Sequence, residues 1–373
     1  MRVCYVSPEV FNWGVHGGFG YITRTLSREL AIRGIDVTVV TPKRRGQKTE
    51  EYLDGVKVVG FNSFSNLRYP INSFLSKILG KNCYKKASAD IYHSQEVSYN
   101  TIIAQKACPG RKHIITFQDP YDEREWRRIA KVDPRYRLST KNRVRLIFEN
   151  RVLASGCQKA DGLYSQANFL SKRAKILFSL NRDPIFLPNP VSIPRRVDGK
   201  SDKPTVCFLA RWDPQKRVEI FFNLARLNPD IQFIAMGHSH SLEKDIRLRK
   251  KFGKISNLSL TGFVSEQEKS HILNKSWALV NTSIREALPV SFLESLAHKT
   301  PIISGENPEN ITTRFGYHVT SDDFSSGLRK MITDPSRKRK GEEGRNYVEK
   351  IHALDKVIQE HIQVYEKVLD EKN

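Results

Sequence analysis

The sequence predicts an α/β protein made of two Rossmann-like domains that face each other across a cleft. Short apolar runs alternate with longer segments of helical periodicity along the chain, which is the pattern of parallel sheets whose strands are joined by helices. A chain of 373 residues also exceeds the size that one hydrophobic core usually supports. Together these two observations favour a pair of parallel-sheet domains.

The first half of the chain has the pattern of one such domain. Its first buried strand is expected over Arg2–Ser7, and a helix over Phe19–Arg33 should end near Gly34. Further short apolar runs predict strands at Val37–Thr41, Val56–Phe61, Ile91–His93, Ile114–Phe117 and Gly162–Ser165. We therefore place the amino-terminal domain over residues 1–188.

A polar, proline-bearing stretch from Ile193 to Pro204 indicates a linker, and a second series of strands follows it. These strands are expected at Thr205–Ala210, Gln232–Met236, Leu258–Thr261, Ala278–Val280 and Pro301–Ser304. They predict a second domain over residues 189–346. The last segment, Tyr347 to Leu369, carries apolar residues at helical spacing and should be an amphipathic helix packed against a large surface.

The composition favours an anionic partner and a reducing compartment. The net charge of +22 suits acidic lipid headgroups, nucleic acid or a phosphorylated substrate. The five cysteines are scattered without a Cys-x-x-Cys pair, so a zinc site or disulfide framework is not indicated, and the cytoplasm is the simplest compartment. No segment resembles a secretory signal or a membrane span, so we expect any membrane contact to be peripheral.

The most informative motif places two glutamates eight positions apart at a junction between a strand and a helix. Glu286 follows the strand ending at Val280 and its polar exit, and Glu294 lies about one turn inside the next helix. Pro289 stands where a first-turn proline is tolerated. The helix start offers N–H groups and partial positive charge to a phosphate, and the carboxylates could bind sugar hydroxyls. The pattern suits a sugar nucleotide, although the spacing alone fits a capped surface helix equally well.

Two other features lie where a phosphate could bind. Gly17-Gly18-Phe19-Gly20 opens the first helix, but Thr23 occupies the third glycine position of the dinucleotide fingerprint, so either a phosphate approach or a plain turn is possible. Arg211 and Lys216 follow a strand end, where the ligand crevice of such sheets lies, and could neutralise a diphosphate. No two aspartates stand two residues apart, so the Asp-x-Asp device that holds a diphosphate through a metal is missing.

These pieces, in this order, resemble the retaining glycosyltransferases of the GT-B fold, specifically glycosyltransferase family four, over nearly the whole chain. The most specific match is the motif from Glu286 to Glu294 with its flanking residues. Supporting matches are Gly17-Gly18, the segment Phe208 to Lys216, Met236-Gly237 and Gly262-Phe263-Val264. The resemblance implies that residues 189–346 bind the donor. It also implies that the final helix, about 347–373, crosses back to complete the amino-terminal acceptor domain.

The resemblance implies roles for individual residues. Arg211 and Lys216 would grip the donor diphosphate, and Glu286 would lie near the donor sugar hydroxyls, so that these three form the catalytic group. Glu294 would bind the nucleotide ribose. Further donor contacts would come mainly from backbone atoms, at Gly18, Gly237, Leu288, Val290 and Ser291.

Several positions depart from the family pattern. Gln118, beside Asp119, replaces a histidine that faces the acceptor, and an amide cannot act as a general base near neutral pH. His93 matches a histidine common at another strand end, where a structural role and an acceptor contact are equally compatible. Arg217 replaces a glycine after the lysine, and Glu306 stands where a second glycine is common. These changes bear on the acceptor more than on the donor.

The resemblance implies transfer of a hexose from a UDP- or GDP-sugar, with retained anomeric configuration, to a glycan or lipid-linked acceptor. The charge that develops on the leaving diphosphate must be stabilised, and protein cations with a helix start can do this. We therefore expect no metal and no other cofactor. A nucleotide-sugar epimerase, a basic nucleic-acid-binding protein and a nucleic-acid-directed glycosyltransferase remain as alternatives, although neither zinc-finger spacing nor an aromatic RNA-binding signature is present.

Positive charge is concentrated between Arg124 and Arg151, where ten basic and three acidic side chains leave an excess of seven positive charges. The first helix expected there carries Trp126 on its apolar side. Segment 124–151 therefore suits adsorption to an anionic membrane surface, so that the protein would be peripheral on the cytoplasmic face. A helix that packs this apolar side onto its own domain is equally compatible.

Overall fold

The computed structural model describes residues 1–14, 17–62 and 80–371. The chain divides into two compact units. Unit 1 comprises Met1–Asp122, Ser139–Pro190 and Asp355–Asn373, and unit 2 comprises Glu123–Leu138 and Val191–Leu354.

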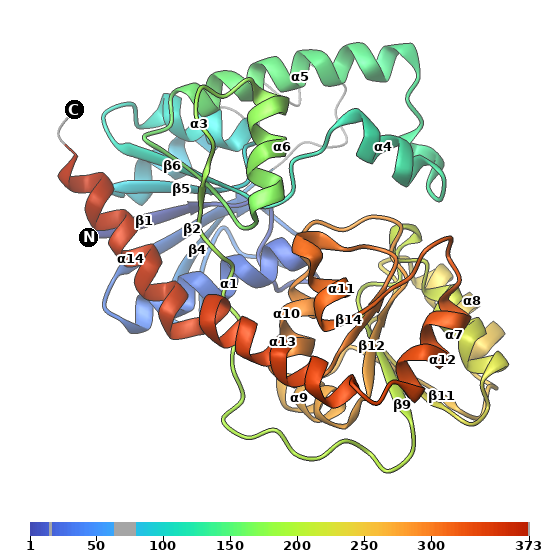
Figure 1. Cartoon of the computed structure of the whole chain (residues 1–373). Coiled ribbons are helices and arrows are strands. Elements are labelled where there is room, and N and C mark those ends of the chain that lie inside the picture. Colours follow the sequence, from blue (N-terminus) through green and yellow to red (C-terminus); the bar gives the residue numbers. More distant parts are fainter. Residues whose placement is uncertain (15–16, 63–79, 372–373) are drawn as a thin grey trace. The chain divides into compact units, whose positions relative to one another are not determined.

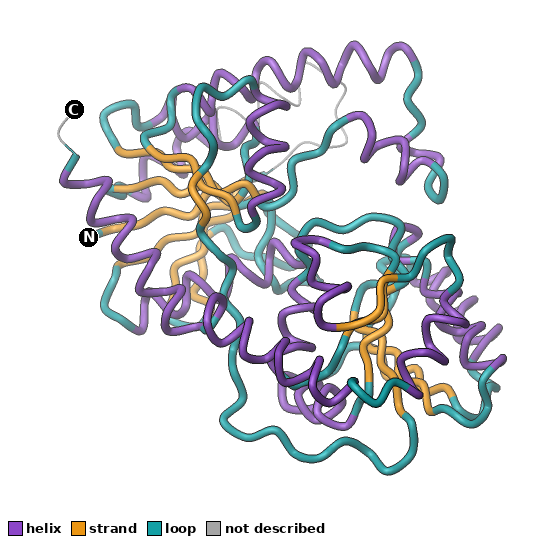
Figure 2. Tube along the Cα trace, viewed as in Figure 1, coloured by secondary structure: helices purple, strands orange, loops and turns teal. Residues whose placement is uncertain are grey.

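Unit 1 is built on a twisted, mainly parallel sheet with helices packed on it (Figures 1 and 2). The strand order is β3-β4-β2-β1-β5-β6-β7-β8, and among the described strands only the edge strand β3 runs antiparallel to its neighbour. The strands span Arg2–Val6 (β1), Asp36–Pro42 (β2), Glu50–Leu53 (β3), Val56–Phe61 (β4), Ile91–Gln95 (β5), Lys112–Phe117 (β6), Gly162–Ser165 (β7) and Ile185–Phe186 (β8).

The helices of unit 1 cover this sheet with apolar faces. Helix α1 buries Ile22, Leu26 and Leu30, which recur at helical spacing. Helix α14 buries a similar stripe, and the hydroxyl of its Tyr365 lies 2.8 Å from that of Tyr5 on the central strand β1. The helices span Gly18–Ile32 (α1), Tyr99–Ala107 (α3), Thr140–Gln158 (α5), Asn168–Phe178 (α6) and Leu354–Asp370 (α14).

Unit 2 contains a parallel sheet in the order β11-β10-β9-β12-β13-β14. Aromatic side chains fill one side of it, and Phe208, Trp212 and Phe233 are at most 1% exposed. The strands span Thr205–Leu209 (β9), Gln232–Met236 (β10), Leu258–Gly262 (β11), Ala278–Asn281 (β12), Ile302–Ser304 (β13) and Gly316–His318 (β14).

The helical elements of unit 2 come from two parts of the chain. Helix α4 (Glu123–Ala130) and the 3-10 turn η1 (Pro134–Tyr136) belong to the short segment 123–138. The others follow the sheet strands: α7 (Val218–Leu227), α8 (Leu242–Phe252), α9 (Glu266–Lys275), α10 (Val290–Ala297), α11 (Ile311–Phe315), α12 (Phe324–Thr333) and α13 (Arg337–His352), with 3-10 turns η2 (Pro214–Lys216) and η3 (Pro308–Asn310).

The predicted fold class is confirmed, and the expected strands start and end within about two residues of the observed ones. Three short strands, β3, β8 and β14, were not predicted. The four residues of β3 and the two residues of β8 are largely exposed, and the three residues of β14 are half-buried, so none of these strands forms a buried apolar run. None of the described helices combines the length and apolar character needed to cross a bilayer.

The prediction of a single helix from Tyr347 to Leu369 is wrong in one respect, because the helical segment is divided at Ala353. The Val191 N–H donates to the His352 carbonyl at 2.8 Å, and the Leu354 N–H donates to the Val191 carbonyl at 3.1 Å. Val191 therefore forms hydrogen bonds with backbone groups on both sides of Ala353, and α13 and α14 form as separate helices. A periodic apolar pattern carries no signal for such an insertion.

Candidate functional site

The carboxyl ends of β9 and β12 lie side by side in the sheet of unit 2. Strand β9 is paired with β10 on one side and β12 on the other, so the strand order reverses here, and ligands of such sheets bind at this point. Arg211 and Lys216 follow β9, Glu286 follows β12, and Glu294 lies on α10. Four predicted donor-site residues are thus carried by the segments that leave this switch point.

Glu286 is the best defined member of the site. Its Oε1 accepts hydrogen bonds from Lys216 Nζ at 2.6 Å, Ser283 Oγ at 2.6 Å and Asn281 Nδ2 at 3.0 Å. Burial acts to raise the pKa of Glu286, but the Lys216 ammonium and these hydrogen bonds outweigh it and hold the pKa below its ordinary value. Glu286 is therefore a carboxylate near neutral pH, suited to accept hydrogen bonds from hydroxyls.

The loops after β9 and β12 are joined by several hydrogen bonds to main-chain carbonyl groups. The Ile284 N–H donates to the Gln215 carbonyl at 3.0 Å, and the Thr282 hydroxyl donates to the Lys216 carbonyl at 2.7 Å. Arg217 adds a bond to the Thr282 carbonyl at 2.7 Å and an ion pair with Asp322. The ammonium of Lys216 is consequently held over the carboxylate of Glu286.

Arg211 is the more accessible cation of the pair. Its side chain is 36% exposed and pairs with Asp213 at 3.1 Å, whereas that of Lys216 is 17% exposed. A half-exposed guanidinium with one carboxylate beside it can turn toward a phosphate and donate two parallel hydrogen bonds to its oxygens.

Glu294 has a partner that the sequence did not reveal. It is 7% exposed, and its Oε1 accepts a hydrogen bond from Lys269 of α9 at 2.6 Å. Lys269 also pairs with Glu266, three positions earlier on the same helix, at 2.8 Å. In the sequence this spacing indicates an ion pair along one helix and gives no sign of the contact with Glu294. A ribose that bound Glu294 would therefore meet a lysine beside it.

The first turn of α10 follows Pro289, whose side chain cannot accept a capping hydrogen bond. Leu288 is buried, while Val290 and Ser291 are partly exposed. The N–H groups of Val290 and Ser291 belong to the first turn, where a helix has no internal acceptors for them. The three predicted backbone contacts thus lie within residues 288–291, on either side of Pro289 at this helix start.

The two predicted glycine contacts differ in their surroundings. Gly237 has φ 120°, and a β-carbon there would lie 2.0 Å from the Ala210 carbonyl oxygen, so the close approach of the two loops itself requires glycine. Gly18, in unit 1, begins α1, and a β-carbon on it would meet open space.

His93 is fully buried at the centre of unit 1. Its Nδ1 lies 2.8 Å from the Tyr365 hydroxyl and its Nε2 lies 2.7 Å from the Thr116 hydroxyl. Burial, with the nearby His361 ring, holds the pKa of His93 well below its ordinary value, so the imidazole is neutral. An acceptor contact at His93 would require one of these two hydroxyls to be replaced.

Gln118 and Asp119 follow β6 and are held by a residue that the sequence did not single out. The partly buried carboxyl group of Glu96 accepts hydrogen bonds from the backbone N–H groups of Gln118 at 3.0 Å and Asp119 at 2.7 Å. Burial raises the pKa of Glu96 to about 7. The amide of Gln118 is also bonded at both ends to Asn189, with distances of 2.8 and 3.1 Å. Nothing in the local sequence distinguishes Glu96 from a surface glutamate.

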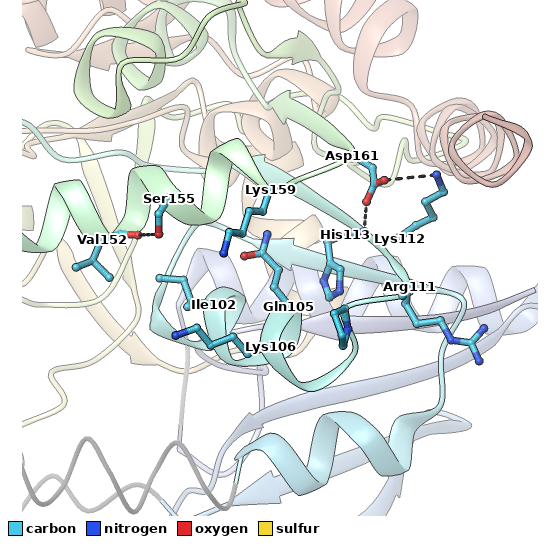
Figure 3. A pocket seen from close by; sticks show the side chains of 12 residues that line it. Ile102, Gln105, Lys106, Arg111, Lys112, His113, Val152, Ser155, Lys159 and Asp161 are labelled. Atoms are coloured by element: carbon cyan, nitrogen blue, oxygen red, sulfur yellow. Dashed lines mark hydrogen bonds and ion pairs between the residues drawn. The ribbon is translucent and has the colours of Figure 1, made fainter. Parts of the chain in front are cut away.

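A pocket of about 570 Å³ lies in unit 1 at the amino end of β6, between α3 and α5 (Figure 3). Basic side chains line it, but Lys112 pairs with Asp161 at 3.4 Å and Arg111 pairs with Asp90 at 3.5 Å. Because ligands of parallel sheets bind at the carboxyl ends of the strands, we do not assign this pocket to the candidate site.

Two family models match the chain. The model described as Glycosyltransferase Family 4 matches residues 16–195, and the model described as Glycosyl transferases group 1 matches residues 192–347. The two matches follow one another along the chain and agree with the two sheets. The chain belongs to the group 1, family 4 glycosyltransferases. A search among curated protein sequences found no significant match.

Solved structures support the GT-B fold of this glycosyltransferase. Sucrose-phosphate synthase from Thermosynechococcus elongatus is 14% identical, with a TM-score of 0.76 and 100% of each chain covered. HepE from Anabaena, in complex with UDP, is 13% identical, with a TM-score of 0.71, and 98% of this chain and 100% of HepE are covered. WaaG, a glycosyltransferase involved in lipopolysaccharide biosynthesis, is 14% identical, with a TM-score of 0.67, and 95% of this chain and 98% of WaaG are covered.

Proposed function

We propose that this glycosyltransferase moves a hexose from a UDP- or GDP-sugar to an acceptor hydroxyl with retention of configuration and without a metal. The observation that carries the proposal is the ion pair of Glu286 and Lys216 at the switch point of unit 2, with Arg211 and the start of α10 on the same loops. The Anabaena protein of similar fold has been solved with UDP and glucose, which agrees with a UDP-sugar donor.

In the proposed reaction the donor diphosphate contacts Lys216, Arg211 and the N–H groups of Val290 and Ser291. The bond between the anomeric carbon and the diphosphate breaks, and the electron pair leaves with the phosphate oxygen. The acceptor oxygen forms its new bond on the same face, and its proton passes to that phosphate oxygen. Positive charge and N–H dipoles that are already in place stabilise the leaving group.

The carboxylates have binding roles in this proposal. The hydrogen bonds that Lys216, Asn281 and Ser283 donate to Glu286 are all made to Oε1, and we assign Oε2 to a hydroxyl of the donor sugar. Since the pKa of Glu286 is lowered, it accepts hydrogen bonds and does not supply a proton. Glu294, beside Lys269, is assigned to the ribose hydroxyls.

Thermal stabilisation by sugar nucleotides tests this function. UDP-, GDP- and ADP-sugars should be compared with and without a chelator, in the parent protein and in Glu294→Ala. We expect one donor to raise the Tm, the shift to survive chelation, and the variant to lose most of it, because a ligand that binds only the folded state stabilises it by mass action. The exposed Glu243→Ala, on α8, is the matched control.

Three outcomes would contradict the proposal. Absence of a shift with every donor would favour a basic binding protein, and a shift that disappears with the chelator would require a metal. Conversion of the donor without an acceptor would indicate an epimerase.

We also propose that the acceptor is lipid-linked and that unit 1 meets an anionic membrane surface through α5. Of the two helices in the basic segment, α4 buries Ile129 within unit 2, and its Trp126 ring packs 5.1 Å from that of Tyr136. On α5, in contrast, Val144, Ile147 and Phe148 are 63%, 55% and 59% exposed. They lie at helical spacing on one side, and exposed arginines of the same helix accompany them, at positions 143, 145 and 151.

A further inference from the structure

The segment 123–138, which we call the arm, lies between two elements of unit 1 in the chain but belongs to unit 2. Strand β6 precedes it and helix α5 follows it. It folds as α4 and the turn η1, joined by the packing of Trp126 on Tyr136 and by Asp133, which accepts from the Arg135 N–H at 3.1 Å.

The arm contacts the loop that carries Glu286. Glu125 of α4 pairs with the guanidinium of Arg285, the residue before Glu286. Arg128, one helical turn further on, donates to the carbonyl of Ile284 and pairs with Glu306. Because positions i and i+3 face the same side of a helix, one face of α4 makes all of these contacts.

Glu306 joins the arm to the same region of unit 2 through its ion pair with Arg128. Burial raises the pKa of Glu306, whereas the Arg128 guanidinium and the Glu286 N–H both act to lower it. The consecutive residues 284 and 285 are thus held through a carbonyl and a side chain. Glu306 is also one of the positions where the sequence departs from its family, which links this departure to a contact of this chain.

The contacts are buried enough to fix the loop. The side chain of Arg285 is 1% exposed and that of Glu125 is 8% exposed, and Glu306 is 11% exposed. A charge in such surroundings needs a partner in place, since an unpaired buried charge is strongly unfavourable. The loop can therefore leave its position only if the arm moves with it or the ion pairs break.

We propose that Glu125 and Arg128 are positioning residues, which hold loop 284–286 so that the Glu286 carboxylate stays on Lys216 and meets the donor sugar in one orientation. The inference rests on the proposed function for its effect on transfer. Its structural part, that the arm fixes the loop, is independent of any reaction.

Hydrogen exchange of the full-length protein tests the structural part. Arg128→Ala removes a side chain that is 40% exposed, so the variant should fold. We expect the amides of residues 284–286 to exchange at least about tenfold faster in it, because their backbone contacts open more often. Arg127→Ala, which removes an exposed charge paired with Glu123 on the same helix, should exchange like the parent protein.

Transfer kinetics test the effect on the reaction. We expect Arg128→Ala to lower kcat by about tenfold to a hundredfold, since a small misplacement of a group near the reacting atoms has effects of this size. Nucleotide affinity should stay within about twofold, because Arg128 does not contact the proposed diphosphate site. In a Glu286→Gln background the same substitution should lower kcat by less than about threefold, because residues that act through one another are not additive.

Equal exchange in Arg128→Ala and Arg127→Ala would overturn the proposal, whether or not the protein turns over any donor. Fully additive effects of Arg128→Ala and Glu286→Gln on kcat would overturn it as well, because they would show that the arm stabilises the protein without acting through Glu286. Absence of turnover by the parent protein with every donor, with faster exchange in Arg128→Ala, would contradict the proposed function and leave the positioning of the loop supported.

Discussion

Arg217 adopts the left-handed backbone conformation, with φ 47° and ψ 41°, directly after Lys216. This conformation costs a residue with a β-carbon about 1–2 kcal/mol, which agrees with the glycine that the family resemblance implies at this position. Here the guanidinium donates to the Thr282 carbonyl and pairs with Asp322 at 2.7 Å. The strained residue therefore joins the loop that holds Lys216 to the loop that holds Glu286.

The two smallest replacements of Arg217 separate strain from contact. Arg217→Ala keeps the strain and loses the contacts, whereas Arg217→Gly loses the contacts and relieves the strain. We expect the free energy of unfolding of Arg217→Ala, measured with denaturant, to be about 1 kcal/mol lower than that of Arg217→Gly. At Arg226, exposed within helix α7, the same pair of substitutions should have the opposite order, by about 0.5–1 kcal/mol. A more stable alanine variant at both positions would contradict the account of strain.

At the scale of elements, the strand–helix succession could be predicted because it depends on local apolar patterns. The Glu286–Glu294 spacing across β12 and α10 is local in the same sense. Partners that are far apart in the chain could not be predicted. Lys216 is 70 residues from Glu286, and Lys269 is 25 residues from Glu294. Such pairings depend on which strands are neighbours and where each loop turns.

The positions of the two helices in the basic segment between Arg124 and Arg151 could not be predicted for the same reason. Its charge is a local property, but the sequence does not show that α4 contributes to unit 2 and α5 to unit 1. The helix with Trp126 packs its apolar side within unit 2, whereas the sequence predicted this helix within the amino-terminal domain. The exposed apolar side belongs to the second helix, α5, whose Phe148 was not singled out from the sequence.

Vesicle binding tests the proposed surface of α5. The double substitution Ile147→Ser and Phe148→Ser should weaken binding to anionic vesicles by at least about tenfold, because it removes apolar area that would enter the interface. Ile176→Ser on α6, where Ile176 is 79% exposed, is the control and should bind like the parent protein. Binding should also fall as salt is raised, because the arginines are screened. Equal binding by the two variants would remove α5 from the contact.

At the scale of the whole molecule, the two sheets share one topological feature. In each unit the first strand lies between two later strands, so that the strand order reverses at this point. Strand β1 lies between β2 and β5 in unit 1, and β9 lies between β10 and β12 in unit 2. The sequence predicts two such domains, and the predicted donor residues of unit 2 lie on the loops that leave its switch point. A net charge of +22, however, offers many cations to any phosphate. The central claim is that the cations at the switch point of unit 2 bind the diphosphate.

Calorimetric titration of the preferred sugar nucleotide into two charge-matched variants tests this claim most directly. Lys216→Met removes the ammonium beside Glu286, and Lys159→Met removes an exposed lysine that lines the pocket of unit 1. We predict that Lys216→Met weakens donor binding by about tenfold to a hundredfold, as expected for the loss of a charge-assisted contact, and that Lys159→Met leaves it unchanged. Equal weakening in both variants, or weakening in Lys159→Met alone, would contradict the account.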